Sequence, residues 1–422
     1  MQWLKEIPSH WEVEPFARHF SYGKGLPITK ADLTQEGIAV ISYGQVHSKL
    51  NKGTTISEEL VRFVSPNYIE SHPQCLLNNG DFVFADTSED IEGSGNFAFN
   101  DYTDKIFAGY HTVVARPIDL PYPQYYAYLF QSLNWKGQIQ SLVNGVKVYS
   151  IGKGHLKKSY LLIPPLAEQE KIVNYLEGKT SKIDAYVAGK EKEIELLQEL
   201  KQKTIADAIT KGLNPDAKMK NSKTLLFGQI PYHWEERKMK YCFSERSEKN
   251  HPEEPILCAS QSQGVIPQSM YQNRVVVVNK GFEGLKFVKV GDFVISLRSF
   301  EGGIEYAYYQ GIISAAYTIL APLNVYNTDY FKFLFKCYPF IQVLQTCVTG
   351  IREGQNINYQ ILGRKFLPLP PKDEQQAIVA YIEEKCQKID KLASELQSEI
   401  DYLKEYKQRL IADCVTGQVK VS

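Results

Sequence analysis

Short runs of β-branched and aromatic residues, separated by turn-forming residues, fill the first long stretch of the chain. Such runs lie at 38–41, 81–84 and 111–115. Runs of this length between Gly, Pro and Asn signals predict the strands of a small mixed sheet. A Tyr- and Phe-rich segment from Pro123 to about Leu133 predicts an amphipathic helix that follows these strands.

A later stretch of the chain, from 221 to about 371, repeats this plan. Its apolar runs predict strands near 275–278 and 312–314, and a second Tyr/Phe cluster follows Asp329. We expect both aromatic clusters to lie between helix and sheet in the cores of two similar domains.

A different pattern follows each of these stretches. Residues 168–211 contain no proline, and residues 373–415 contain neither proline nor glycine. Apolar residues recur there at spacings of three and four, which predicts two long helices with a coiled-coil seam. The predicted seam positions are Ile183, Val187, Ile194, Leu197, Leu200 and Ile205 in the first helix and Ile389, Leu392, Leu396, Leu403, Tyr406 and Leu410 in the second.

Each helix would be about 60 Å long at 1.5 Å per residue. Because an isolated amphipathic helix leaves its apolar stripe uncovered, we expect the two helices to pack on one another, antiparallel. In the alternative arrangement each helix packs on its own domain. Gly178 and Gly189 lie inside the first helix and put its continuity in question.

The two halves of the chain also share sequence motifs in the same order. Ile-Pro-x-His-Trp-Glu occurs at 7–12 and 230–235, Gly-Asp-Phe-Val at 80–83 and 291–294, Pro-Pro-x-x-Glu-Gln at 164–169 and 370–375, Lys-Ile-Asp at 182–184 and 388–390, and Ile-Ala-Asp-x-x-Thr at 205–210 and 411–416. Internal repetition of this kind dictates the architecture. Residues between the shared motifs differ, so we expect the two domains, which share one scaffold, to recognise two different targets.

The predicted fold is therefore of the α+β class. Two pseudo-symmetric globular α/β domains are separated by two long antiparallel helices that form a coiled coil. The predicted segments are 1–165 (first domain), 166–212 (central helix), 213–371 (linker and second domain) and 372–422 (C-terminal helix).

Composition and missing motifs limit the function. The 422 residues carry no net charge, and the seven cysteines lack a Cys-x-x-Cys pair, so we expect reduced thiols. The absence of a signal-like start and of long apolar segments predicts a cytoplasmic protein without membrane contact. A phosphate-binding Gly-x-x-x-x-Gly-Lys-Ser/Thr loop, an Asn/Asp-Pro-Pro-aromatic tetrad and a His-Glu-x-x-His pair are missing from the sequence. We therefore expect no catalysis, cofactor or metal in this chain.

Several polar and basic residues in the variable segments suit contact with DNA, because phosphates attract cations and base edges pair with amide, hydroxyl and guanidinium groups. An ordinary soluble surface loop is the alternative for each segment. The candidates in the first half are Lys24, Lys30, Ser42, Gln45, His47, Thr87, Ser88, Lys147, Tyr149, Lys153 and Lys157. The candidates in the second half are Arg298, Ser299, Arg352, Gln355, Asn356 and Asn358.

The shared motifs, in duplicate and in order along the whole chain, resemble those of the specificity subunits of type I restriction–modification systems. The resemblance implies that the domains are target recognition domains for a bipartite, asymmetric DNA site with an unread gap. It also implies two adenine-methyltransferase subunits and two endonuclease/translocase subunits as partners, which would hold S-adenosylmethionine, ATP and Mg. A coiled-coil scaffold that binds only protein is the alternative function.

Overall fold

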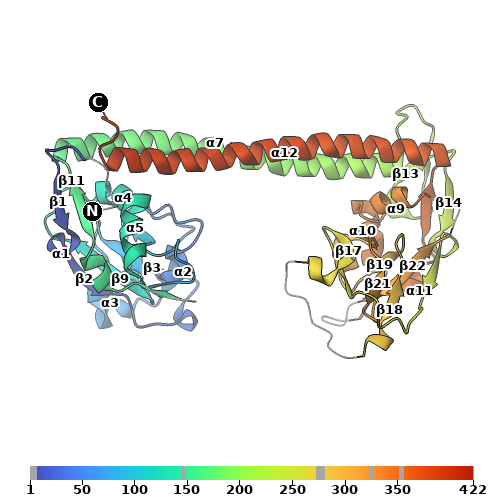
Figure 1. Ribbon diagram of the computed structural model, residues 1–422, viewed down its shortest axis with the longest axis horizontal. Helices are drawn as coiled ribbons and strands as arrows, with labels where there is room; N and C mark the ends of the chain where they lie inside the picture. Colours follow the sequence, from blue (N-terminus) through green and yellow to red (C-terminus); the bar gives the residue numbers. More distant parts are fainter. Residues whose placement is uncertain (1–6, 144–147, 272–280, 324–326, 351–355, 422) are drawn as a thin grey trace. The chain divides into compact units, whose positions relative to one another are not determined.

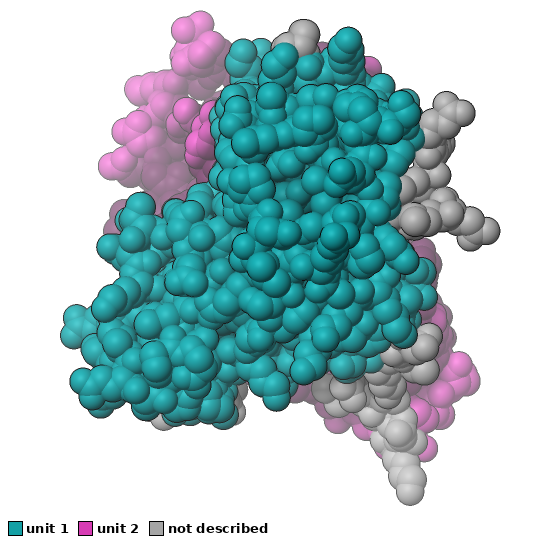
Figure 2. Space-filling model, turned by 90° about the vertical axis from the view of Figure 1, so that its left-hand side faces the viewer, with its two compact units in different colours: residues 1–190, 398–422 teal, residues 191–397 magenta. Residues whose placement is uncertain are grey.

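The computed structural model describes residues 7–143, 148–271, 281–323, 327–350 and 356–421. The chain divides into two compact units, which Figure 2 colours separately. Unit 1 comprises Met1–Lys190 and Ser398–Ser422, and unit 2 comprises Glu191–Gln397. Each unit therefore combines one globular domain with a part of each long helix.

Unit 1 contains a four-stranded antiparallel sheet with the strand order β2-β9-β5-β7 and a three-stranded sheet with the order β4-β3-β8. The strands of these sheets are β2 (Phe20–Lys24), β9 (Thr112–Pro117), β5 (Phe82–Ala85), β7 (Phe97–Phe99), β4 (Arg62–Val64), β3 (Ile38–Ile41) and β8 (Ile106–Ala108). Two further pairs are β1 (Glu12–Pro15) with β11 (Tyr160–Ile163) and β6 (Thr87–Ser88) with β10 (Tyr149–Ser150). The helices are α1 (Phe16–His19), α2 (Tyr43–Val46), α3 (Tyr68–Ser71), α4 (Pro123–Gln131), α5 (Leu133–Leu142) and α6 (Lys153–Lys157), with 3-10 turns η1 (Lys30–Asp32) and η2 (Pro73–Cys75).

Unit 2 contains a four-stranded sheet with the order β15-β22-β19-β20. Its strands are β15 (Phe243–Arg246), β22 (Thr318–Pro322), β19 (Phe293–Ile295) and β20 (Glu305–Tyr306). Five strand pairs accompany it: β12 (Met219–Asn221) with β13 (Gln229–Pro231), β14 (Glu235–Lys238) with β25 (Phe366–Leu369), β16 (Leu257–Ser260) with β17 (Gly264–Pro267), β18 (Lys286–Val288) with β21 (Gly311–Ile313), and β23 (Val348–Thr349) with β24 (Asn356–Ile357). The helices are α8 (Ser299–Gly302), α9 (Thr328–Leu334), α10 (Tyr338–Gln345) and α11 (Tyr359–Leu362), with 3-10 turns η3 (Leu225–Phe227), η4 (Met239–Tyr241), η5 (Gln268–Met270) and η6 (Phe282–Gly284).

The four-stranded sheets of the two units have the same strand order and the same antiparallel pairing. The runs predicted at 38–41, 81–84, 111–115 and 312–314 fall on β3, β5, β9 and β21. The helix predicted from Pro123 is two helices, because α4 ends at Gln131 and α5 begins at Leu133. The strand predicted near 275–278 lies outside the described residues. The predicted α+β fold with two pseudo-symmetric domains is confirmed.

A buried aspartate anchors the equivalent strand in each unit. Gly80 and Gly291 have φ values of 91° and 95°, and each is followed by an aspartate that lies directly before the central strand, β5 or β19. Asp81 Oδ2 lies 2.6 Å from Arg116 Nη1, and Asp292 Oδ2 lies 2.8 Å from Arg246 Nε. The arginine comes from β9 in unit 1 and from β15 in unit 2. Both units therefore have the Asp–Arg ion pair, but the arginine lies on strands that are not equivalent.

Aromatic side chains form the core between helix and sheet, as expected from the two Tyr/Phe clusters. In unit 1 the ring of Phe130 in α4 lies 5.0 Å from Phe82 and 4.4 Å from Trp135. In unit 2 the ring of Phe335 lies 5.0 Å from Phe293 and 4.8 Å from Phe340. Each cluster fixes two helices on the four-stranded sheet.

The two long helices are α7 (Leu166–Lys211) and α12 (Lys372–Val415), drawn as long ribbons in Figure 1. Gly178 and Gly189 do not interrupt α7. In unit 1, Lys407 Nζ lies 2.7 Å from Asp184 Oδ1 and Lys190 pairs with Glu399, so the helices run antiparallel. In unit 2, Lys201 Nζ lies 2.7 Å from Asp390 Oδ1.

The two ion pairs of 2.7 Å are related by the sequence repeat. Asp390 follows Asp184 by 206 positions, Lys407 follows Lys201 by 206 positions, and the Pro-Pro motifs have the same offset. Both pairs therefore define one antiparallel register, and the Asp of each Lys-Ile-Asp motif binds a lysine of the other helix.

The predicted seam of these helices is partly wrong. Ile183, Val187, Leu396 and Leu410 are buried as predicted, but the seam also contains Ile400, which is fully buried. Three predicted seam residues are about half exposed instead: Leu200, Leu392 and Tyr406. The sequence contains a second apolar stripe beside the seam, and spacing alone does not separate the two stripes.

The shared motifs meet at one junction in each unit. His10 Nε2 lies 2.8 Å from Glu168 Oε1, and His233 Nε2 lies 2.8 Å from Glu374 Oε2. Beside them lies the glycine that ends the other helix. Gly417 (φ 70°) contacts Pro8 and Trp11 in unit 1, and Gly212 (φ 71°) contacts Pro231 and Trp234 in unit 2. Trp11 and Trp234 are buried, as expected for shared frame residues.

Candidate nucleic-acid interface

Predicted contact residues from three distant segments of unit 1 come together. Strand β10 pairs antiparallel with β6, which places Tyr149 opposite Ser88. His47, which follows α2, lies against the same strand, where its Nε2 donates to the carbonyl oxygen of Thr87 at 2.9 Å. His47, Thr87, Ser88 and Tyr149 therefore form one cluster, although 102 positions separate the first from the last.

A half-buried lysine holds His47 from the other side. Nδ1 of His47 accepts from Asn96 Nδ2 at 3.1 Å, and Lys136 Nζ in α5 donates to Asn96 Oδ1 at 2.7 Å. Burial lowers the pKa of the Lys136 ammonium. This chain of hydrogen bonds fixes the tautomer and direction of the His47 ring. Sequence reasoning missed Asn96 and Lys136, because no spacing or motif links them to His47.

A cavity of about 460 Å³ adjoins this cluster, and its rim is acidic. It is lined by Tyr43, Gly44, His47, Ser88, Glu89, Asp90, Glu92, Gly93 and Asn96. Carboxylates repel phosphates but accept hydrogen bonds from the amino group of cytosine. The acidic rim therefore suits base edges better than backbone, and the sequence-based list of contacts omitted its carboxylates.

Three predicted contact residues, Ser42, Ser88 and Ser299, are buried in the protein, and Asn358 is half-buried. Ser42 is fully buried, and its backbone N–H donates to Gln45 Oε1 at 3.1 Å at the start of α2. Ser299 is 1% exposed, and its Oγ accepts from the Ser296 N–H at 2.8 Å. Asn358 caps α11 by accepting from the N–H groups of Gln360 and Ile361. These side chains support loops, and Ser42 and Ser299 present no surface to a ligand in this structure.

Four of the predicted lysines of unit 1 lie within the described residues, and these four are exposed, as phosphate contacts require. They are Lys24 at the end of β2, Lys30 in η1, and Lys153 and Lys157 in α6. Lys157 Nζ lies 5.3 Å from the ring centre of Tyr22, two residues before Lys24 on β2. Burial raises the pKa of Tyr22 to about 12, so this phenol stays neutral beside the lysine.

In unit 2, Arg298 and Asn356 are exposed. Arg298 directly precedes α8, and Asn356 pairs with Thr349 in the β23–β24 hairpin. Arg352 and Gln355 of unit 2 lie outside the described residues, as does Lys147 of unit 1. The second candidate surface is therefore described only in part.

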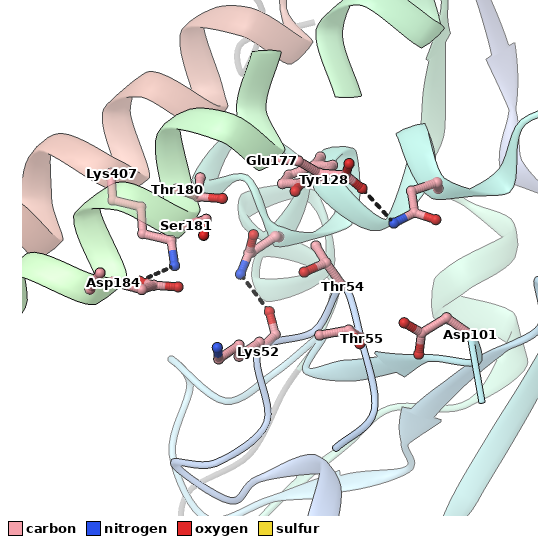
Figure 3. A pocket seen from close by; sticks show the side chains of 13 residues that line it. Lys52, Thr54, Thr55, Asp101, Tyr128, Glu177, Thr180, Ser181, Asp184 and Lys407 are labelled. Atoms are coloured by element: carbon pink, nitrogen blue, oxygen red, sulfur yellow. Dashed lines mark hydrogen bonds and ion pairs between the residues drawn. The ribbon is translucent and has the colours of Figure 1, made fainter. Parts of the chain in front are cut away.

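A polar cavity of about 540 Å³ lies between the first domain and α7, within unit 1 (Figure 3). Lys407 and Asp184 form an ion pair at one side of it, and Gln124 Nε2 donates to Glu177 Oε1 at 3.0 Å. The lining contains none of the predicted DNA contacts. This cavity is therefore separate from the candidate interface.

Comparisons with known proteins agree with this architecture. Residues 19–196 match the family model described as the type I restriction modification DNA specificity domain. The type I restriction enzyme EcoKI specificity subunit of Escherichia coli (strain K12) is 19% identical over 428 residues, with 98% of this chain and 90% of that protein covered. The resemblance to type I specificity subunits is confirmed.

Two solved structures have the same fold. A chain from a study of complex assembly and conformational transition of the type I R-M system superposes with a TM-score of 0.69 at 17% identity, over 98% of this chain and 100% of that chain. The HsdS subunit from Thermoanaerobacter tengcongensis superposes with a TM-score of 0.52 at 17% identity, over 98% and 99%. Among the described residues, no helix is long and apolar enough to span a membrane. All seven cysteines are free and buried.

Proposed function

We propose that this chain reads a bipartite, asymmetric DNA site and directs adenine methylation or restriction by partner subunits. Each domain reads one half-site. Catalysis, with its S-adenosylmethionine, ATP and Mg, belongs to two methyltransferase and two endonuclease/translocase subunits.

The observation that carries this proposal is one frame with two different sets of loops. Both units contain the same four-stranded sheet and the same buried Asp–Arg pair. The segment after the central strand differs: in unit 1 it leads to β6 and the acidic cavity, and in unit 2 it leads to Arg298 and α8. Carboxylates suit cytosine and arginine suits guanine, so the loops of the two domains favour different bases.

Exposed apolar residues on the long helices support a partner that is present in two copies. Tyr186, Tyr402 and Tyr406 in unit 1 are 68%, 71% and 54% exposed. Their counterparts at an offset of 206 are Leu392, Leu196 and Leu200 in unit 2, at 46%, 50% and 50%. Large apolar side chains at equivalent exposed positions suit two equivalent docking surfaces, one for each methyltransferase subunit.

These two surfaces can be tested separately. The variant Y186S/Y402S/Y406S and the variant L196S/L200S/L392S each remove one surface, and Y241S is a control at an exposed tyrosine outside the two long helices. We expect native mass spectrometry of the complex with the methyltransferase subunit to show one bound copy for each triple variant and two for the control. Two copies bound by both triple variants would exclude these surfaces.

The function itself is tested by mapping methylated adenines. The chain is co-expressed with its neighbouring methyltransferase subunit in a host free of adenine methylation. A split, asymmetric motif methylated on both strands is expected. A stable complex without methylation would favour the protein-binding scaffold, and the binding of that complex to DNA would then lack the steep salt dependence that phosphate contacts produce.

A further inference from the structure

An ion pair in unit 2 joins a buried carboxylate, Glu305, to a half-buried lysine, Lys336. Glu305 in β20 is 2% exposed, and its Oε1 lies 2.5 Å from Lys336 Nζ, which follows α9 in the chain. The same ammonium donates to the carbonyl oxygen of Gly302 at 2.9 Å and to that of Gln261 at 3.2 Å. An ammonium group has three N–H donors, and all three are used. One side chain therefore connects β20, the end of α8 and the loop between β16 and β17.

The α8 segment packs against its neighbours without spare room. A Cβ on Gly302 would lie 2.7 Å from Gln261 Cδ, and a Cβ on Gly303 would lie 2.2 Å from the carbonyl oxygen of Phe335. Gln345 Nε2 donates to the carbonyl oxygen of Phe300 at 3.3 Å, from α10. The backbone that follows Arg298 is thus held from several sides, while the Arg298 side chain is exposed.

The chemistry of the pair favours a geometric role over a stabilising one. Burial raises the pKa of Glu305, and Lys336 opposes this rise. Such a pair adds little stability compared with apolar residues of similar volume, because the Glu305 carboxylate loses its water while the Lys336 ammonium, whose side chain is 31% exposed, keeps part of its own. Apolar residues, however, would leave the carbonyl groups of Gly302 and Gln261 without a donor. The Lys336 ammonium links these two carbonyl groups, and an apolar side chain at this position would break that link.

We propose that Lys336 and Glu305 are positioning residues, which fix the α8 segment against the Gln261 loop so that Arg298 reads a guanine in the second half-site. This inference rests on the proposed DNA-reading function. It assigns a specificity role to two residues that sequence reasoning did not select.

The test is methylation mapping with four variants of the full chain in complex with its methyltransferase subunit. R298A removes the reader, K336M removes the clamp, K336R keeps a cation, and K336M/E305Q removes the clamp without leaving an unpaired buried charge. K332M is the matched control, because Lys332 contacts Asp329 at 2.8 Å and the Tyr306 ring at 3.9 Å.

We expect R298A and K336M to relax the same base pair of one half-site, with discrimination there lowered about tenfold or more. The other half-site stays unchanged, K336R recovers part of the discrimination, and K332M keeps the full motif. The K336M/E305Q variant regains melting temperature relative to K336M but keeps the relaxed motif, which a merely stabilising pair would not do.

Different results separate the two hypotheses. If the wild-type complex methylates a split site and K336M keeps the wild-type motif, the positioning role is refuted while the proposed function stands. If K336M/E305Q recovers both stability and the full motif, the pair only stabilises the fold. An absence of methylation with the wild-type complex refutes the proposed function itself.

Discussion

The proposed reading of two half-sites makes the length of α7 and α12 a determinant of the unread gap. The sharpest perturbation lengthens both helices together. Four residues are inserted into α7 after Glu193 and four into α12 after Gln397. In the register set by the Asp184–Lys407 and Lys201–Asp390 pairs, these insertion points face one another. Each ion pair keeps its own partner, and the coiled coil takes up the shift of the seam, about 40°, by unwinding locally at the insertion.

The expected change follows from helix geometry. Four residues add about 6 Å of length and about 40° of rotation, at 1.5 Å and 100° per residue. DNA advances about 3.4 Å and about 34° per base pair. The rotation corresponds to about one base pair and the translation to about two. We therefore expect the gap to grow by one or two base pairs, with both half-sites unchanged.

The assay is adenine-methylation mapping of the wild-type and lengthened chains, with a four-residue insertion in α7 alone as the control. The control shifts Lys201 away from Asp390 whenever Asp184 keeps Lys407, so it should lose complex stability. An unchanged gap in the paired insertion variant, with methylation retained, would refute the idea that the helices set the gap. A longer gap in the control would show that helix pairing does not matter.

Two further predictions concern buried charges in unit 1. D81N leaves the Arg116 guanidinium without its carboxylate. Because Arg116 is partly exposed, we expect the free energy of unfolding, measured with denaturant, to fall by about 3 kcal/mol, the lower end of the usual range. The control E195Q, in the exposed Lys192–Glu195 pair, should cost under about 1 kcal/mol, and equal losses would contradict the burial argument. Burial lowers the pKa of Lys136 in the folded protein below its ordinary value of 10.5. Between that lowered pKa and pH 10.5 the unfolded chain binds more protons than the folded one, so the stability of the wild type relative to K136M should rise with pH towards 10.5. A melting-temperature difference between the two proteins that is flat from about pH 8 to 10.5 would contradict this.

The sequence predicted the strands and long helices well because their signals are local. The apolar run at 38–41 coincides with β3, and the runs after Gly80 and Gly291 became the central strands. The seam of the long helices was less predictable. Leu200, Leu392 and Tyr406 have coiled-coil spacing, but they belong to an exposed stripe next to the seam. Only the partner helix distinguishes the two stripes, and one sequence does not contain that information.

The residues of the candidate site could be predicted from sequence only where the chemical type of the side chain alone indicates a role. The exposure of lysines such as Lys24 and Lys157 follows from the charge of the side chain, whichever element carries it. The contacts that position His47 do not, because Asn96 and Lys136 lie far away in sequence and belong to no motif. The burial of Ser42 and Ser299 was also hidden, since a hydroxyl group serves equally well as a loop support or as a surface contact.

The repeated motifs lie where the domain of one copy contacts the end of the long helix of the other copy. Tyr125 Oη donates to the carbonyl oxygen of Val415 at 3.2 Å, and Tyr330 Oη donates to that of Ile209 at 3.3 Å. Each domain is thus completed by the helix end that belongs to the other copy. The motifs that recur are those of the shared junctions, which must fit together in both units. The loops are not constrained in this way. Their sequences can therefore change, and with them what they contact, while the junctions preserve the fold.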